Sequence, residues 1–226
     1  MRTLEPVRAL RKRRYAPRVS PEQRLWWRRL LLVFARPRPV FAALRSTDEE
    51  DEAARQEPVL LVVLLAGMAS VLFSAAWRGV LDQPAVDGLA AAVLTFVAGG
   101  TQGAVAYLLV GGAIHLGSRG MGNSARFRTT RHVLAFAAAP FALSLLVIVP
   151  AALIAYGGDW FRSGGADEGA GGDVLLAGGF VFAFWSAGLL VLGLRETLGL
   201  PWAGVAGTLL LAGVLLAGLA VLPSVL

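Results

Sequence analysis

Few side chains in this 226-residue chain could do chemistry, and their spacing argues against an enzyme. His115 and His132 flank a basic loop, and two imidazoles without a third ligand make a poor metal site. The acidic run Asp48–Glu52 has no histidine or cysteine beside it, so we interpret it as the solvated first turns of a helix. The chain has no cysteine, which excludes disulfides and thiolate chemistry. We therefore expect no catalytic residue, no metal and no cofactor.

The apolar runs that would position such groups hold no Asp, Glu, Lys or Arg. Ion-coupled carriers keep ionisable side chains at this depth because the coupling requires them. The main polar side chains within the runs are Thr95, Thr101, Gln102, Ser144 and Ser186. Hydroxyl and amide groups at such positions mostly bond between helices, so Gln102 is predicted to be a helix-packing residue, with contact to a substrate as the alternative.

The apolar runs themselves identify an integral membrane protein. The chain is 56% hydrophobic, with a mean hydropathy of +0.65. About 20 apolar residues of helix cross the ~30 Å hydrocarbon core of a bilayer. We predict an all-α bundle of five transmembrane helices in a membrane domain over residues 58–226. The expected spans are residues 58–77, 89–116, 133–156, 174–194 and 202–222.

Arginine placement predicts the orientation. Arg119, Arg126, Arg128 and Arg131 occupy the loop between the second and third spans, which has no acidic residue. Because cytoplasmic loops collect Arg and Lys, we expect the N-terminus and this loop in the cytoplasm, the C-terminus outside, and the protein in the cell membrane. The net charge of +6 is concentrated ahead of the first span, so we expect contact with anionic membrane lipids and no nucleic-acid partner.

Residues 1–57 are predicted to form a cytoplasmic basic arm with an amphipathic helix over about residues 21–34. Its broad apolar face includes Trp26 and Trp27, with Arg28 and Arg29 along the edge. Indole rings at headgroup depth and guanidinium groups that reach phosphate are typical of a helix in the plane of the membrane interface. The alternative is a helix packed on the cytoplasmic face of the bundle.

Small residues and prolines predict how the spans pack. Gly99 and Gly103 have the spacing that lets helices approach closely, and we expect them to join spans two and three at the centre of the bundle. Pro140 and Pro150 lie inside the third span, which should therefore kink or break.

Three stretches resemble the bacterial Yip-one (Ypt-interacting protein) domain family. The segment Arg36–Leu44 resembles its entry to the first span, Gly117–Thr130 with Val133–Pro140 resembles its centre, and Trp185 with Leu192–Leu200 resembles the link between its last spans. The match covers the chain from about residue 36 to the C-terminus and implies a five-helix bundle with a cytoplasmic N-terminus. Eukaryotic relatives bind Rab-type GTPases in vesicle trafficking, and that partner is not carried over because the arm has no evident GTPase-binding motif.

These observations favour a non-enzymatic membrane protein that organises lipid or partner proteins at the cytoplasmic face. The expected contact residues are Trp26, Trp27, Arg28, Arg29, Arg119, Arg126, Arg128 and Arg131. Self-association into a homo-oligomer is left open. The alternative is a small transporter or permease subunit with a path lined by spans two and three.

Overall fold

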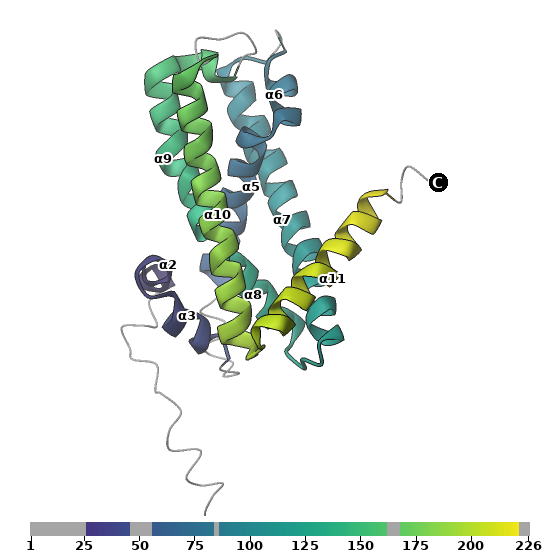
Figure 1. Ribbon diagram of the computed structural model, residues 1–226. Helices are drawn as coiled ribbons and strands as arrows, with labels where there is room; N and C mark the ends of the chain where they lie inside the picture. The colour runs from purple at the N-terminus through teal and green to yellow at the C-terminus, as the bar shows by residue number, and fades with distance from the viewer. Residues whose placement is uncertain (1–25, 46–55, 84–85, 162–167, 222–226) are drawn as a thin grey trace, which may run out of the picture.

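The computed structural model describes residues 26–45, 56–83, 86–161 and 168–221, and within these ranges it contains helices and no strands (Figure 1). The all-α prediction is confirmed for this part of the chain. The elements are α2 (Trp26–Ala35), α3 (Pro37–Ala43), α5 (Gln56–Phe73), α6 (Ala75–Leu81), α7 (Gly88–Gly120), α8 (Phe127–Ala137), α9 (Ala139–Tyr156), η2 (Gly157–Phe161), α10 (Ala170–Leu198) and α11 (Trp202–Val221).

Four helical segments of the described chain are long and apolar enough to cross a membrane. They are Gly88–Gly120, Phe127–Trp160, Ala170–Leu198 and Trp202–Leu219. The apolar part of α5, Val59–Phe73, is shorter. The structure thus supports a multi-pass membrane protein with four candidate spans, and the fifth span stays a prediction.

The first predicted span is not one continuous helix, which corrects the range 58–77. α5 ends at Phe73, Ser74 is extended with ψ 127°, and α6 begins at Ala75. Serine favours such a boundary, although its side chain makes no capping hydrogen bond here. The change of direction brings Trp77 against α7, where its indole Nε1 donates a hydrogen bond to Gln102 Oε1 at 3.0 Å.

The third span breaks beside Pro140, as its proline predicts. α8 ends at Ala137 and α9 begins at Ala139, which places Pro140 in the first turn of α9. A proline at this position frees backbone groups that a membrane cannot hydrate. The N–H of Phe141 instead donates to Ser186 Oγ of α10 at 3.0 Å. A hydroxyl from a neighbouring helix thus replaces the backbone carbonyl that would accept this bond in an unbroken helix.

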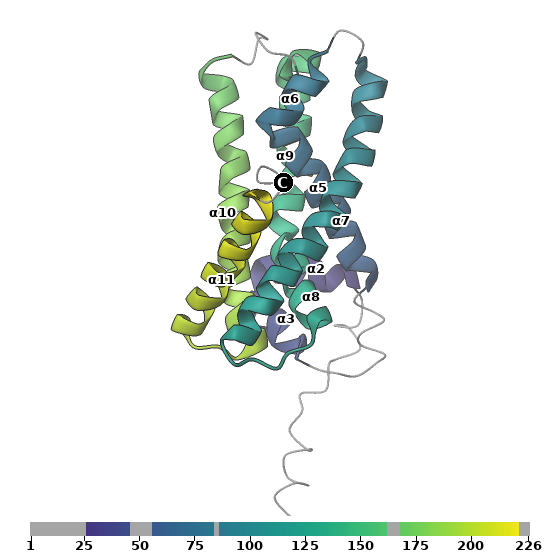
Figure 2. The same cartoon turned by 90° about the vertical axis from the view of Figure 1, so that its right-hand side faces the viewer.

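The helices form a bundle in which α5 contacts α7 and α9, and α10 contacts α8 and α9. α11 packs along the lower part of α7 and leans away from α10 (Figures 1 and 2). α2 lies across the bundle axis: Figure 1 shows it end-on and Figure 2 shows it from the side. The bundle therefore combines upright helices with one short helix perpendicular to them.

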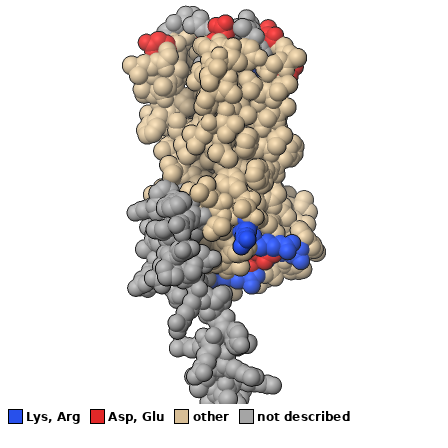
Figure 3. Space-filling view, turned by 90° about the vertical axis from the view of Figure 1, so that its left-hand side faces the viewer, with Lys and Arg blue, Asp and Glu red and all other residues tan. Residues whose placement is uncertain are grey.

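On the face shown in Figure 3, charged residues lie at the two ends of the bundle and its middle is uncharged. The acidic end carries residues of the α6–α7 turn, η2 and the start of α10, among them Asp82, Asp87, Asp159 and Asp173. The opposite end, here called the basic end, is formed by α3 and the adjoining ends of α7, α8 and α10 (Figure 1), and it carries Glu196 together with Arg38, Arg119, Arg126, Arg128, Arg131 and Arg195. Between them, large apolar side chains such as Ile154 and Phe184 are 88% and 75% exposed, which is typical of surfaces that face lipid.

Candidate interaction surface at the basic end

The basic loop of the sequence is mostly helical in the structure. Arg119 lies in the last turn of α7, Arg126 is the N-cap of α8, and Arg128 and Arg131 lie within α8. The connection itself is only Met121–Arg126, shorter than the loop expected between spans ending near residue 116 and starting near residue 133. Arginine is a good helix former, and Arg119 is also stabilised as a cation near the C-terminus of α7, so the helices extend beyond the apolar runs.

Polar bonds fix this connection to the ends of neighbouring helices. Asn123 accepts from the N–H of Ala125 at 2.7 Å and donates through Nδ2 to the carbonyl of Leu198, at the end of α10, at 2.8 Å. Gly122, with φ 81°, supplies the left-handed turn that lets the chain reverse. These bonds hold the α7–α8 connection in place, and with it the positions of Arg119 and Arg126 at the ends of the two helices.

The three stretches that carry the family resemblance meet at one point. Phe41 of α3, Val133 of α8 and Leu194 of α10 are each 0% exposed. A Cβ added at Gly193 would lie 2.8 Å from both Phe41 Cε1 and Val133 Cγ1, so only glycine fits there without displacing them. Thr197 Oγ1 donates to the carbonyl of Phe41 at 2.9 Å. Residues from α3, α8 and α10 therefore form one packed junction that supports the basic end.

The ion pair at this junction contributes little. Arg38 Nε lies 3.9 Å from Glu196 Oε1, and the Arg38 side chain is 74% exposed. Such exposed pairs typically contribute about 0–1 kcal/mol. Apolar packing around Phe41, and not charge pairing, joins α3 to the bundle.

Arg131 is less exposed than Arg119, Arg126 and Arg128, the other predicted contact residues whose side chains the structure describes. Its guanidinium carbon lies 4.4 Å from the ring centroid of Phe127 and 5.1 Å from that of Tyr107. The ring of His115 meets the ring of Phe127 edge-on at 5.5 Å. Sequence reasoning missed Tyr107 and Phe127, although an aromatic residue four positions before an arginine on a helix is a detectable signal.

Trp26, Trp27, Arg28 and Arg29 belong to the first turn of α2, and their side chains lie outside the described part of the structure. Farther along α2 the helix has two different faces. Val33 is 0% exposed, whereas Leu31 is 61% exposed. The predicted start of this helix, near residue 21, also lies outside the described residues.

The predicted close approach at Gly99 and Gly103 occurs, but with α5 as the partner. A Cβ at Gly99 would lie 2.6 Å from the Cα of Met68, and a Cβ at Gly103 would overlap the carbonyl oxygen of Val63. Gly67 of α5 faces both glycines, and a Cβ there would overlap the carbonyl oxygen of Gly99. These three glycines, here called the glycine seam, join α5 to α7, whereas the sequence predicted that Gly99 and Gly103 join spans two and three.

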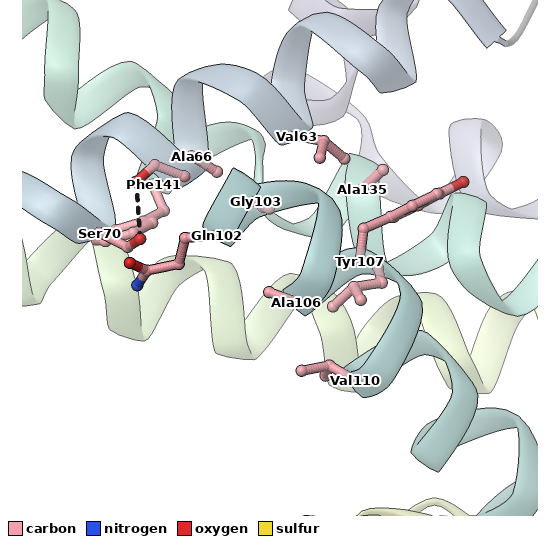
Figure 4. Close-up of a pocket in the computed structure, with 13 residues that line it drawn as sticks. Val63, Ala66, Ser70, Gln102, Gly103, Ala106, Tyr107, Val110, Ala135 and Phe141 are labelled. Carbon is pink, nitrogen blue, oxygen red and sulfur yellow. Dashed lines mark hydrogen bonds between the residues drawn. The ribbon is translucent and has the colours of Figure 1, made fainter. Parts of the chain in front are cut away.

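A groove lies between α5, α7 and the α8–α9 break, with a volume of about 230 Å³. Figure 4 shows its lining, with Ser70 and Gln102 at one end and Tyr107 and Val110 at the other. Ser70 Oγ donates to the carbonyl of Gly67 at 2.8 Å, and Gln102 accepts from Trp77. Both polar groups already have partners within the protein, and the rest of the groove is almost entirely apolar.

The two histidines lie at the basic end without a metal-binding neighbourhood. His115 is on α7 and the buried His132 is on α8. Within the part of the chain that the structure describes, no three His, Asp or Glu side chains gather closely enough to hold a metal ion.

Comparison with protein families gives one match, to the Yip1 domain, over residues 31–224. The matched region begins within α2 and includes all three stretches of the packed junction. Neither a curated protein nor a solved structure matches the chain.

Proposed function

Because the chain belongs to the Yip1 domain family, we propose that it is a non-enzymatic protein of the cell membrane that organises lipid or a partner protein at its basic end. The observation that carries the proposal is the separation of charge along the bundle. Arginines predominate at one end, where Glu196 pairs with Arg38, and acidic residues predominate at the other, which also carries Arg78; the surface between them on the face shown in Figure 3 is apolar. This is the pattern of a protein held across a bilayer with its arginines at one headgroup layer.

The proposed topology has five spans, with α5 as the first and the basic end in the cytoplasm. α5 packs between α7 and α9, so it shares their depth in the bundle. Its described apolar part of 15 residues, Val59–Phe73, covers about 22 Å at 1.5 Å per residue, and α6 adds length after the bend at Ser74. The excess of arginine at the basic end favours the cytoplasmic side for it.

α2 is proposed to lie in the cytoplasmic membrane interface. Its axis is perpendicular to the bundle, and Phe34 meets Trp185 of α10 edge-on at 5.5 Å between ring centroids. One face thus packs on protein while Leu31 points outward, so the two interpretations of this helix are compatible. The arm (residues 1–57) and the membrane domain (residues 58–226) would then differ in their depth in the membrane. They would share one hydrophobic core, because Phe41 of the arm belongs to the core of the bundle.

Within this proposal the working surface consists of α2 and the residues Arg119–Arg131. Anionic lipid is the preferred contact because each basic residue near an acidic membrane surface contributes about 1 kcal/mol. The transporter alternative gains no support, since Gln102 and Ser70 bond within the protein and the groove offers few other polar groups.

Single cysteines in the full-length protein test the proposal, because the chain has no native cysteine. An impermeant maleimide applied to intact cells should label Ser224→Cys and not Ser124→Cys. In vesicles, a fluorophore on Leu31→Cys should be quenched by lipids labelled near the headgroup and be shielded from aqueous iodide, whereas one on Ser124→Cys should be quenched by iodide. Equal maleimide labelling of both serine positions would contradict the topology. Equal iodide quenching of both fluorophores would contradict the interfacial position of α2.

A further inference from the structure

Arg131 is held in a fixed place by the residues around it. Its aliphatic stem passes over Gly111 of α7, where an added Cβ would lie 2.6 Å from Arg131 Cγ. Its guanidinium lies against the rings of Phe127 and Tyr107. Aromatic faces attract and orient this cation, but they do not neutralise its charge.

The charge of Arg131 has no anionic partner among the described residues. Its Nε is buried and makes no hydrogen bond there, and the same holds for Nδ1 of the neighbouring His115. Other arginines add to the positive potential, since Arg128 is near enough to interact electrostatically with Tyr107, and Arg119 with His115. A partly buried cation without a counter-charge loses some of its hydration, so the surroundings of Arg131 favour an anion.

The groove adjoins the Arg131 guanidinium, because Tyr107 contacts that guanidinium and also lines the groove. On α7 the groove extends from Gln102 to Val110, which is about 12 Å at 1.5 Å per residue. Ala106 in its lining is exposed, so the groove opens on the outside of the bundle. The neighbouring outward positions on α7, Val105 and Leu108, are 47% and 50% exposed and apolar.

We propose that this combination is a binding site for one anionic phospholipid, with its phosphate on Arg131 and part of an acyl chain in the groove. A guanidinium matches a phosphate through paired N–H donors. An apolar groove that opens beside lipid-facing side chains suits an acyl chain and not a soluble anion. The inference rests on the proposed membrane location and names the lipid that the basic end would hold.

Native mass spectrometry of the intact protein tests the headgroup half of the site. Detergent-purified protein is mixed with dioleoyl phosphatidylglycerol or dioleoyl phosphatidylcholine, and the retained lipid is counted. The wild type should retain the anionic lipid preferentially. Arg131→Gln should lose that preference by about tenfold, the usual size of one charge-assisted hydrogen bond. Arg195→Gln should keep it, although the Arg195 guanidinium also lies over a ring, 4.3 Å from the centroid of Trp202.

A second pair of variants tests the groove. Ala106→Phe should fill it and lower retention of both lipids, whereas Ala104→Phe changes an exposed position of α7 outside the groove and should lower neither. A phosphatidylglycerol with a photoreactive acyl chain should cross-link within residues 102–110. This wild-type experiment decides the question even if Arg131→Gln does not fold.

Three results would overturn the site. They are an unchanged lipid preference in folded Arg131→Gln, cross-links elsewhere in the chain, and displacement of the lipid by equimolar inorganic phosphate, which would indicate a site for a free anion. The Leu31 fluorescence measurement is independent of these results, so failure of the lipid site is distinguishable from failure of the proposed interfacial helix.

Discussion

Replacing Gly99 by alanine should force α5 and α7 apart. The added Cβ would lie 2.6 Å from the Cα of Met68 and 2.7 Å from its N. The approach to Cα is about 0.8 Å short of the 3.4 Å at which ordinary contact begins. Because both neighbouring atoms are backbone, no side-chain rotation can relieve the overlap.

The magnitude follows from a comparison with Gly213, a helical glycine of α11 where an added Cβ meets nothing within 4 Å. Alanine favours the helix by up to about 1 kcal/mol at either position, so this gain cancels between the two variants. The remainder is the cost of overpacking, about 1–3 kcal/mol. Membrane helices associate through close packing, and a gap of 0.5–1 Å loses about a quarter to a half of each contact's dispersion attraction.

The assay is unfolding of the full-length protein in mixed micelles by added SDS, followed by circular dichroism. Gly99→Ala should lower the free energy of unfolding by about 1–3 kcal/mol relative to Gly213→Ala. Gly100→Ala, whose Cβ meets only the flexible end of Leu64 at 3.3 Å, should fall between them. If Gly99→Ala is as stable as Gly213→Ala, then α5 and α7 are not packed as closely at Gly99 as the structure shows.

Phe41→Ala should cost about 3–5 kcal/mol of unfolding free energy, because this ring is fully buried in the junction, whereas Leu31→Ala at an exposed position should cost far less in the same assay. Trp77→Phe and Gln102→Leu should each lower the free energy of unfolding, because each removes the hydrogen bond between these side chains. The double variant should lose about 0.6 kcal/mol less than the sum of the two single losses, the typical value for a hydrogen bond between membrane helices. Strict additivity of the losses would mean that the bond contributes nothing. Ser186→Ala should cost about 1–3 kcal/mol because it leaves a backbone N–H of α9 without its acceptor, and restoration by Ser186→Thr would separate this loss from a packing defect.

The sequence by itself determined the class of the protein, because apolar length and charge placement are local properties. Runs of apolar residues predict helices that cross a membrane, and Pro140 predicts the break between α8 and α9, since proline removes a backbone donor wherever the helix packs. The ends of elements are similarly local: Asp87 caps α7 through a bond to the N–H of Ala90 at 2.7 Å, and Gly199 ends α10 with φ 68°.

The tertiary structure alone decided which surfaces meet, because a pattern of small or aromatic residues marks a face of a helix and not its partner. Gly99 and Gly103 predicted a close approach, but only the packing identified Gly67 as the residue opposite. The aromatic surroundings of Arg131 combine Phe127 of its own helix with Tyr107 of another, and only the first of these is a sequence neighbour. Contacts between distant residues depend on how all the helices fill space together, which no single stretch of sequence specifies.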